Sequence, residues 1–551
     1  MSVGDYAQWS HDELIAEVKK LTRRKKFGLV WEDRAEDLVQ ELNSNLPVIE
    51  RIKSKSVAGQ EDAPNHLLIE GDNLHALQIL SYTHQGLIDL IYIDPPYNTG
   101  NKDFRYNDVF VEKEDSFRHS KWLSFMSRRL KLAKGLLSDA GVIFMSIDEN
   151  EFAHLKLLGD EIFDERNYVM DIIWNSRKSV SSDAIVSLNH NHTLVWAKDI
   201  EALRGLNKQG IRFKLPTRES NFANPDNDPR GPWAADPFDA PGIRPNLTYP
   251  IKNPNTGESH MPPNGRCWRT TPEEYSKYLS EGRIIFGKTG KSKPQLKRYL
   301  SDAEAKGMTP KSLWDDVDTT TNGTQELETI LGEKKFNNPK PLSLLLRILE
   351  LGTDKNSIVL DFMAGSGTTG HAVLEQNKID GGNRKFILAT NNENEICEEV
   401  TFPRIRNVMQ GYTTPGKKKI EGLGGNLWYF KSKIVSAKPT DSNKYFITKQ
   451  AIGVLCIKES CFEPVVENPN FIILENATHQ LGILFGFDHM KDFKIHIMNT
   501  TKKINVYVFS LSDDDFADEF EEFGEQVKTV PIPKALMSAY VRSQKLIRSN
   551  K

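Results

Sequence analysis

Four consecutive residues, Asp94-Pro95-Pro96-Tyr97, combine the groups needed to activate an amino group. They follow the apolar run LIDLIYI, which predicts a buried strand, and ligands of open α/β sheets bind beside the carboxyl ends of strands. The exocyclic amino group of adenine or cytosine is a weak nucleophile, because its lone pair is delocalised into the ring. The Asp94 carboxylate and the Pro95 carbonyl could each accept one of its hydrogens and return electron density to the nitrogen, while the prolines stiffen the loop.

Tyr97 adds a flat ring on which a base can stack, which is worth roughly 1–3 kcal/mol per base. That contribution offsets part of the unstacking cost of flipping a base out of a duplex. Asp94 could also receive the proton that the amino group sheds after methylation. The structural alternative is a plain Pro-Pro turn after a strand.

A glycine-rich loop, expected between a strand and a helix, is the second segment of interest. It comprises Asp361, Phe362, Met363, Ala364, Gly365, Ser366, Gly367 and Thr368. Glycines let the backbone approach a ligand closely, and a helix N-terminus offers free N–H donors. Gly365–Gly370 also fits the dinucleotide pattern G-x-G-x-x-G, with Glu393 after the next strand. Alone, this pattern would permit a nicotinamide-dependent oxidoreductase; together with Asp94–Tyr97 it indicates an adenosine-containing methyl donor.

Other patterns are interpreted as carrying no chemistry. Gly282–Thr289 matches the phosphate-binding pattern G-x-x-x-x-G-K-[ST], but it follows polar sequence and precedes poor helix formers, whereas that loop must join a strand to a helix. His190 and His192 could be metal ligands or bases, and we interpret them as structural residues or as walls of a base pocket. The four cysteines are scattered without a C-x-x-C pair, so no disulfide framework and no metal site are predicted.

The order of apolar runs predicts the fold class. HLLIEGD, LIDLIYID, GVIFMSID and TLVWAKD alternate with helical stretches, and SIVLDF and KFILATNN resume the pattern after a long gap. Continuous apolar runs between helices favour a buried, mostly parallel sheet of the doubly wound, Rossmann-like α/β class. The polar gap predicts that an insertion splits this domain.

These patterns divide the 551 residues into five parts. We expect a helical N-terminal arm, the catalytic half of the α/β domain, an insertion, the donor-binding half and a small C-terminal α/β domain. Their ranges are 1–60, 61–200, 201–334, 335–425 and 426–551. In the last part FIILE, FKIHIM and INVYVFSLS are predicted to be strands.

The bulk properties are those of an ordinary globular protein. The net charge is −3, so DNA binding would depend on local basic patches. No apolar run is long enough for a membrane helix, and the polar N-terminus does not resemble a secretion signal. With few cysteines, a reducing cytoplasmic location without membrane association is expected.

The order of the motifs, with Asp-Pro-Pro-Tyr first, then an insertion, then the glycine-rich loop, resembles the circularly permuted beta class of DNA amino-methyltransferases. More narrowly, the chain is similar to the modification (Mod) subunits of type III restriction–modification systems. The similarity includes KKFGLVWED, GDNLHALQIL, FNNPKPLSLLLRIL, DFMAGSGTTGHAV and GGNRKFILATNNEN.

The resemblance implies roles for individual residues. Asp94–Tyr97 would form the catalytic loop, and Asp361–Thr368 would line the methionine part of S-adenosyl-L-methionine. Asp72 and Asn73, expected at the end of the strand beside the catalytic one, would lie near the donor, and Lys340 and Pro341 would flank its pocket. Asp72 could instead be a helix N-cap, and Lys340 a surface residue.

Two positions depart from the family pattern. Met363 stands where the family usually has Phe, and Met can still pack on the ligand. The acidic residue expected for the ribose hydroxyls is displaced, because two asparagines end the strand and Glu393 comes one position later.

The insertion is the expected target-recognition domain for double-stranded DNA. Arginine can bind guanine edges and lysine neutralises phosphates. Candidate contacts are Arg218, Arg230, Trp233, Arg244, Arg266, Trp268, Arg269, Arg283, Lys288, Lys291, Lys293, Lys297 and Arg298. The resemblance also implies a homodimer and a helicase–nuclease restriction subunit as partner.

The leading hypothesis is therefore an adenine-N6 DNA methyltransferase that acts on a flipped-out base. The Asp form of the catalytic loop favours adenine in this family, and cytosine N4 is the chemical alternative. A second hypothesis is a non-catalytic DNA-recognition subunit that keeps the fold as a scaffold.

Overall fold

The computed structural model describes most of the chain. The described residues are 10–11, 14–15, 29–59, 63–180, 182, 184–210, 212–217, 219–287, 289–438, 440–486, 489–512, 514, 516–532 and 534–548. They form two compact units, one of residues 1–203 with 312–551 and one of residues 204–311. No helix among the described residues is both long and apolar enough to cross a membrane.

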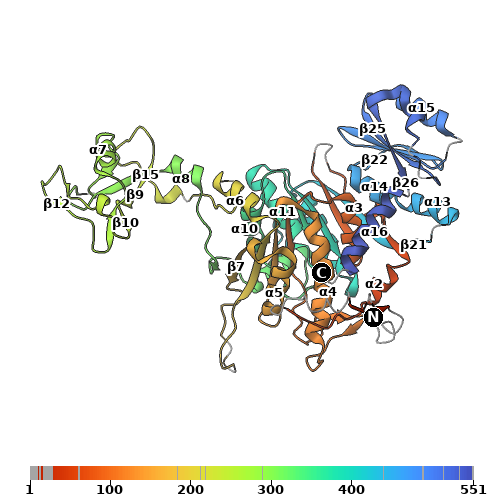
Figure 1. The fold of residues 1–551 in the computed structure, drawn as a ribbon, viewed down its shortest axis with the longest axis horizontal. Coiled ribbons are helices and arrows are strands. Elements are labelled where there is room, and N and C mark those ends of the chain that lie inside the picture. The colour runs from red at the N-terminus through yellow and green to blue at the C-terminus, as the bar shows by residue number, and fades with distance from the viewer. Residues whose placement is uncertain are drawn as a thin grey trace. The chain divides into compact units, whose positions relative to one another are not determined.

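The first unit is built on a ten-stranded sheet in the order β1-β21-β2-β18-β17-β3-β6-β8-β7-β16 (Figure 1). In that order the strands are Asn45–Arg51, Asn426–Ser436, Asn65–Glu70, Lys385–Thr390, Ile358–Asp361, Ile88–Ile93, Leu137–Ile147, Asn191–Ala197, Tyr168–Trp174 and Leu313–Trp314. From β21 to β6 every neighbouring pair is parallel. The parallel sheet expected from the apolar runs is confirmed.

Helices cover both faces of this sheet. Ile91 and Ile93 of β3 belong to the same core cluster as α3 (Asn73–Thr83), α4 (Arg118–Leu136) and α5 (Phe152–Phe163). Leu90, which points to the other face because strand side chains alternate, lies against Gly352 at the end of α10 (Leu342–Gly352). Helices α11 (Thr368–Asp380), α12 (Phe402–Gln410) and α9 (Thr320–Leu331) continue the layer that α10 begins.

The N-terminal part differs from the helical arm expected over residues 1–60. Most of the first 28 residues of this arm lie outside the described residues. After the short helix α2 (Asp37–Glu41), β1 pairs antiparallel with β21. Part of the arm is thus helical, but residues 45–51, which the same prediction included, form an edge strand, because their backbone groups pair with a strand from the distant C-terminal part of the chain.

The C-terminal part begins later than predicted. Residues 426–436 are β21 of the main sheet, and a separate five-stranded sheet follows in the order β22 to β26. Its strands are Glu463–Glu467, Phe471–Glu475, His479–Leu484, Lys503–Phe509 and Val527–Ile532. The predictions for FIILE and INVYVF are confirmed. FKIHIM is instead in helix α15 (Met490–Met498), because Phe493 and Ile497, four positions apart, are both buried on one helix face.

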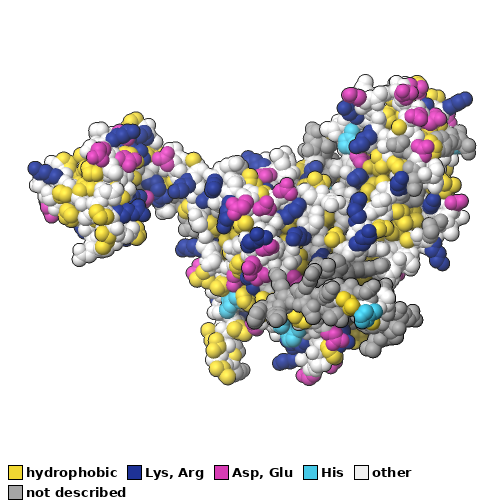
Figure 2. All heavy atoms as spheres, in the orientation of Figure 1, with side chains coloured by type: hydrophobic (Ala, Val, Ile, Leu, Met, Phe, Trp, Pro, Cys, Tyr) yellow, Lys and Arg dark blue, Asp and Glu magenta, His cyan; other side chains and the backbone are white. Residues whose placement is uncertain are grey.

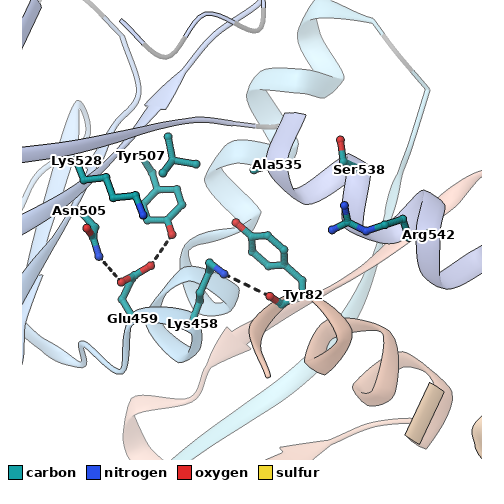
Figure 3. Close-up of a pocket in the computed structure, with 10 residues that line it drawn as sticks. Tyr82, Lys458, Glu459, Asn505, Tyr507, Lys528, Ala535, Ser538 and Arg542 are labelled. Carbon is teal, nitrogen blue, oxygen red and sulfur yellow. Dashed lines mark hydrogen bonds between the residues drawn. The ribbon is translucent and has the colours of Figure 1, made fainter. Parts of the chain in front are cut away.

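Two C-terminal helices attach this part to the main sheet. Helix α16 (Lys534–Arg548) packs against α3 and α4, and α14 (Ile452–Glu459) packs against β1. At the end of α14, the Glu459 carboxylate accepts hydrogen bonds from Asn505 and Tyr507, and the Lys458 ammonium lies 4.6 Å from the centre of the Tyr82 ring (Figure 3).

The second unit, residues 204–311, has a small core of its own. Phe238, Ile251, Trp268, Tyr275, Ile284 and Phe286 are buried together. Strands β9 (Trp233–Pro237), β15 (Gln295–Tyr299) and β14 (Ile284–Ile285) form a three-stranded sheet. Two strand pairs, β10 (Asp239–Pro241) with β13 (Arg266–Trp268) and β11 (Ile251–Lys252) with β12 (Ser259–His260), and the helices α7 (Pro272–Ser280) and α8 (Leu300–Lys306) also belong to this unit. Residues 312–331, expected in the insertion, belong to the first unit, because β16 pairs with β7 and α9 packs on α12.

Candidate functional site

The two candidate motifs meet at one edge of the main sheet. Strands β3 and β17 are parallel neighbours, with Leu90 opposite Val359 and Ile91 opposite Leu360. Asp94 follows β3 and Asp361 ends β17. Because parallel strands point the same way, residues 94 and 361 lie beside each other although they are far apart in the sequence.

Lys340 contacts the Asp-Pro-Pro-Tyr loop directly. Its buried ammonium lies 2.5 Å from Asp94 Oδ2 and donates a hydrogen bond of 2.9 Å to Tyr97 Oη. The second carboxylate oxygen, Asp94 Oδ1, is buried without a hydrogen-bond partner among the described residues. Asp94 therefore has one oxygen held by a cation and one acceptor left open.

The rest of the loop is attached to its surroundings. The Pro96 carbonyl accepts a 2.7 Å hydrogen bond from the buried indole of Trp122. Asn98 adopts a left-handed backbone with φ of 57°, and its fully buried amide donates to the Arg118 carbonyl and to the Glu151 carboxylate. Burial, with the charge of Asp94 next, raises the pKa of Tyr97 well above its ordinary value. The Tyr97 ring is thus a neutral phenol on a fixed support.

The glycine-rich loop is a strand-to-helix connection, as predicted. Asp361 Oδ1 accepts from the Met363 backbone N–H at 3.0 Å, and Oδ2 accepts from the Thr369 hydroxyl at 2.5 Å. No ion pair involves this carboxyl among the residues that the structure describes, and burial raises its pKa to about 7. Gly365 and Gly367 have φ of 48° and 76°, conformations that favour glycine.

Hydrogen bonds join this loop to Lys340. The Thr368 hydroxyl donates to the Lys340 carbonyl at 3.1 Å, while Arg404 Nη1 donates to Thr368 Oγ1 at 2.7 Å. Arg404 is completely buried, and burial lowers its pKa. Sequence reasoning missed Arg404, because one arginine in a short helix gives no signal of its own. Lys340 was predicted beside the donor pocket, and its contact with Asp94 was not foreseen.

Asp72 and Asn73 occupy a different place from the one expected. Strands β18 and β17 lie between β2 and β3, so Asp72 does not follow the strand beside the catalytic one. Asp72 caps α3 by accepting from the Leu74 N–H at 2.6 Å, and Arg129 Nε donates to Asn73 Oδ1 at 2.5 Å. These contacts fit the helix-cap alternative stated for Asp72.

Glu393 lies near the expected edge but is engaged elsewhere. It follows β18, the neighbour of β17, and its carboxylate pairs with Arg105 at 2.9 Å.

On the far side of β3, His192 Nδ1 lies 2.9 Å from Asp171, and the Asn191 amide reaches Tyr97 Oη at 3.5 Å. The start of β8 is thus a neighbour of the Tyr97 ring.

Many of the candidate DNA-contacting cations in the second unit are paired with acids. Arg230 pairs with Asp228, Lys297 with Asp226 and Asp228, Arg266 with Asp239, and Arg269 and Arg298 with Asp236. On the face shown in Figure 2, basic side chains of this unit are interspersed with acidic and hydrophobic ones. Arg244, Lys291 and Lys293 are exposed and have no ion pair among the described residues, whereas Arg218 and Lys288 lie outside them.

The pattern at 282–289 is not a strand-to-helix loop. It contains β14, and the next element in the chain is β15, which pairs antiparallel with β14. The interpretation of this segment as an accidental match agrees with that geometry.

Comparison with known proteins gives one family. The model of a family described as DNA methylase matches residues 88–402. The chain is 33% identical over 449 residues to the type III restriction-modification enzyme StyLTI Mod subunit of Salmonella typhimurium. This alignment covers 76% of this chain and 66% of that protein. It is also 33% identical over 396 residues to the type II methyltransferase M.KpnI of Klebsiella pneumoniae, covering 65% of this chain and 91% of that protein.

This chain therefore spans just under two thirds of the length of the Salmonella relative. Among solved structures, a putative DNA modification methylase of Thermus thermophilus, complexed with S-adenosyl-L-methionine, aligns over 66% of this chain and 99% of its own. The identity of the two chains is 14% and the TM-score is 0.31.

The raised pKa of Asp361 predicts a pH-dependent stability. Between the ordinary value of 3.8 and about 7, the folded protein holds a proton that the unfolded chain has released. Raising the pH through this window therefore lowers the free energy of unfolding, by at most about 1.4 kcal/mol per pH unit. Denaturant unfolding at pH 5, 6, 7 and 8 should show that wild type loses more stability than Asp361→Asn, and a constant difference between the two would contradict the assignment.

Proposed function

Because the chain belongs to the DNA methylase family, we propose that it transfers a methyl group from S-adenosyl-L-methionine to N6 of an adenine flipped out of double-stranded DNA. The observation that carries this proposal is the state of Asp94. One of its carboxylate oxygens is fixed by Lys340 and the other is a buried acceptor without a partner among the described residues. Asp94 directly follows β3, and the glycine-rich loop follows β17, the parallel neighbour of β3.

The Asp94 loop would activate the amino group. Asp94 Oδ1 and the Pro95 carbonyl accept the two hydrogens of the adenine amino group and return electron density to N6. The Tyr97 ring stacks on the flipped base, worth roughly 1–3 kcal/mol, and the hydrogen bond from Trp122 to the Pro96 carbonyl holds the loop in place. The proton that leaves N6 passes to Asp94 Oδ1.

The methyl donor is S-adenosyl-L-methionine, which supplies an electrophilic methyl group on a positively charged sulfur. The residues Asp361 to Thr368 fit this group. Asp361 is a buried acid without an ion-pair partner among the described residues, and a cationic ligand would compensate its charge. The glycine conformations leave the backbone of the loop open to close approach.

The other proposed donor contacts lie around this loop. Pro341 and Lys340 precede α10, and the Lys340 carbonyl is held by Thr368. Glu393 would reach the ribose hydroxyls by leaving Arg105. Met363, which is partly buried, would pack on the ligand in place of the usual aromatic ring.

Adenine is preferred over cytosine N4 on two grounds. The catalytic loop has Asp at position 94, the form that favours adenine among similar enzymes. The Salmonella relative, similar over most of this chain, is named a type III Mod subunit. From the name of this relative we propose that the protein is a type III Mod subunit. The family resemblance further implies that it acts as a homodimer with a helicase–nuclease restriction subunit.

The second unit is proposed to read the target sequence. Arg244, Lys291 and Lys293 are the strongest candidates for DNA contacts, because they are exposed and have no acidic partner among the described residues. Arg230 and Lys297, which share the buried Asp228, are better explained as structural residues of this unit.

Modification mapping of cellular DNA tests the function. DNA from cells that express wild type or Asp94→Ala is sequenced with single-molecule detection of modified bases. We expect N6-methyladenine in one short asymmetric motif, present only with wild type. N4-methylcytosine alone would overturn the choice of base. The absence of any modified motif in both samples would favour the non-catalytic alternative, and a titration with S-adenosyl-L-methionine would then decide.

Replacing Lys340 tests its role as a positioning residue. Lys340→Met keeps the length of the side chain but removes the charge that fixes Asp94, so kcat should fall about 100-fold, the scale of a misplaced catalytic group. The KM for DNA should change little, and Lys340→Arg should recover part of the rate.

Lys335→Met is the matched control, because Lys335 lies in the same segment and pairs with Glu399 instead. It should leave kcat unchanged. A kcat for Lys340→Met within twofold of wild type would show that Lys340 does not position Asp94.

A further inference from the structure

We propose that His119, Glu151 and His154 form a binding site for a divalent transition-metal ion such as Zn²⁺, next to the Asp94–Tyr97 loop. His119 lies in the first turn of α4, Glu151 directly precedes α5, and His154 lies in the first turn of α5. One ligand atom from each residue lies within 4.8 Å of the other two.

The carboxylate of Glu151 is the centre of this cluster. Its side chain is completely buried, and its only ion-pair neighbours among the described residues are the two histidines. His119 Nδ1 lies 2.7 Å from Oε1, and His154 Nδ1 lies 2.8 Å from Oε2. Glu151 Oε2 and His154 Nδ1 form no hydrogen bond of acceptable geometry with any described residue.

A buried carboxylate needs a compensating positive charge. Neutral imidazoles do not supply one, and no lysine or arginine pairs with Glu151 among the described residues. A divalent ion between the three side chains would meet this need and would also satisfy the two unpartnered atoms. Two imidazoles and one carboxylate, with an open position for water, are a ligand set that suits zinc.

The geometry allows an ion to enter. The side chains of His119 and His154 are 41% and 33% exposed, so rotation of these rings can admit an ion to the buried ligand atoms between them. The two rings lie 4.5 Å apart at an angle of 31°. Ligand atoms around zinc are separated by roughly 3.3 Å, as bond lengths of about 2.1 Å require, and small rotations of the exposed rings would open the present 2.7–2.8 Å contacts to that distance.

Sequence reasoning predicted no metal site and considered only His190 and His192 as ligands. The Glu-x-x-His spacing of Glu151 and His154 is a pattern of metal-binding helices, but the third ligand comes from another helix, 32 positions before Glu151. Only the packing of α4 against α5 brings His119 to the other two.

The site would have a structural role for the neighbouring loop. Glu151 Oε1 also accepts a 2.5 Å hydrogen bond from the amide of Asn98, the residue after Tyr97. Asn98 holds a left-handed conformation, which needs support from its surroundings. A metal ion on Glu151 would fix the carboxylate that anchors Asn98, and so would stiffen the end of the Asp94–Tyr97 loop.

Metal titration of the full chain tests this site. The protein is stripped with a chelator and titrated with Zn²⁺ by calorimetry and with Co²⁺ by visible absorption. We expect one equivalent to bind wild type, with Co²⁺ bands typical of nitrogen and oxygen ligands and a higher Tm in Zn²⁺. His119→Ala and Glu151→Gln should each weaken binding at least tenfold.

His119→Ala keeps the test valid if Glu151→Gln fails to fold, because His119 is partly exposed. His489→Ala is the control, since His489 is a partly exposed histidine beside Asp492 and outside the cluster; it should bind like wild type. No stoichiometric binding by wild type, or equal affinity in His119→Ala and wild type, would overturn the proposal and leave the cluster as a hydrogen-bonded anchor for Asn98.

Discussion

The parallel pairing of β3 with β17 is the constraint on which the rest of the site depends. It aligns the carboxyl ends of two strands from opposite ends of the methylase region and so places Asp94 beside Asp361. Backbone hydrogen bonds fix this register, and both strands are buried. The unit of residues 204–311 can be inserted between them in the chain without disturbing the pairing, because the chain leaves the main sheet after β8 and returns to it at β16, two strands that both pair with β7.

Lys340 couples the two motifs that this pairing brings together. Its ammonium fixes Asp94 and Tyr97, while its backbone carbonyl accepts from Thr368 at the start of α11. The Arg404 guanidinium donates a hydrogen bond to the Thr368 hydroxyl, and the Thr401 hydroxyl donates to the Gly365 carbonyl. A change in the glycine-rich loop can thus reach Asp94 through one residue, which provides a physical route by which donor binding and base activation could depend on each other.

The sequence predicted the local parts of this arrangement well. Apolar runs identified the strands, and residue types identified Asp94–Tyr97 and Asp361–Thr368, because strand burial and loop chemistry are local properties. It could not predict contacts set by distant pairing. The helical prediction for residues 45–51 is wrong because their partner strand β21 is far away in the sequence, and the placement of Asp72 is wrong because β18 and β17 separate β2 from β3. The strand prediction for FKIHIM is wrong because its alternation masks the helical spacing of Phe493 and Ile497. Arg404 and the His119–Glu151–His154 cluster depend on helix packing, which leaves no mark in a short motif.

If Asp94 Oδ1, the oxygen without a hydrogen-bond partner among the described residues, takes part in the chemical step, its removal must slow methyl transfer itself. This role is tested most directly by single-turnover methyl transfer with saturating S-adenosyl-L-methionine and enzyme in excess over DNA, comparing wild type with Asp94→Ala. We expect the rate constant to fall at least about 100-fold, the lower end for loss of a group that handles a proton, while DNA binding measured by fluorescence anisotropy stays nearly constant. A rate constant for Asp94→Ala within a few-fold of wild type, with DNA still bound, would contradict this role of Asp94.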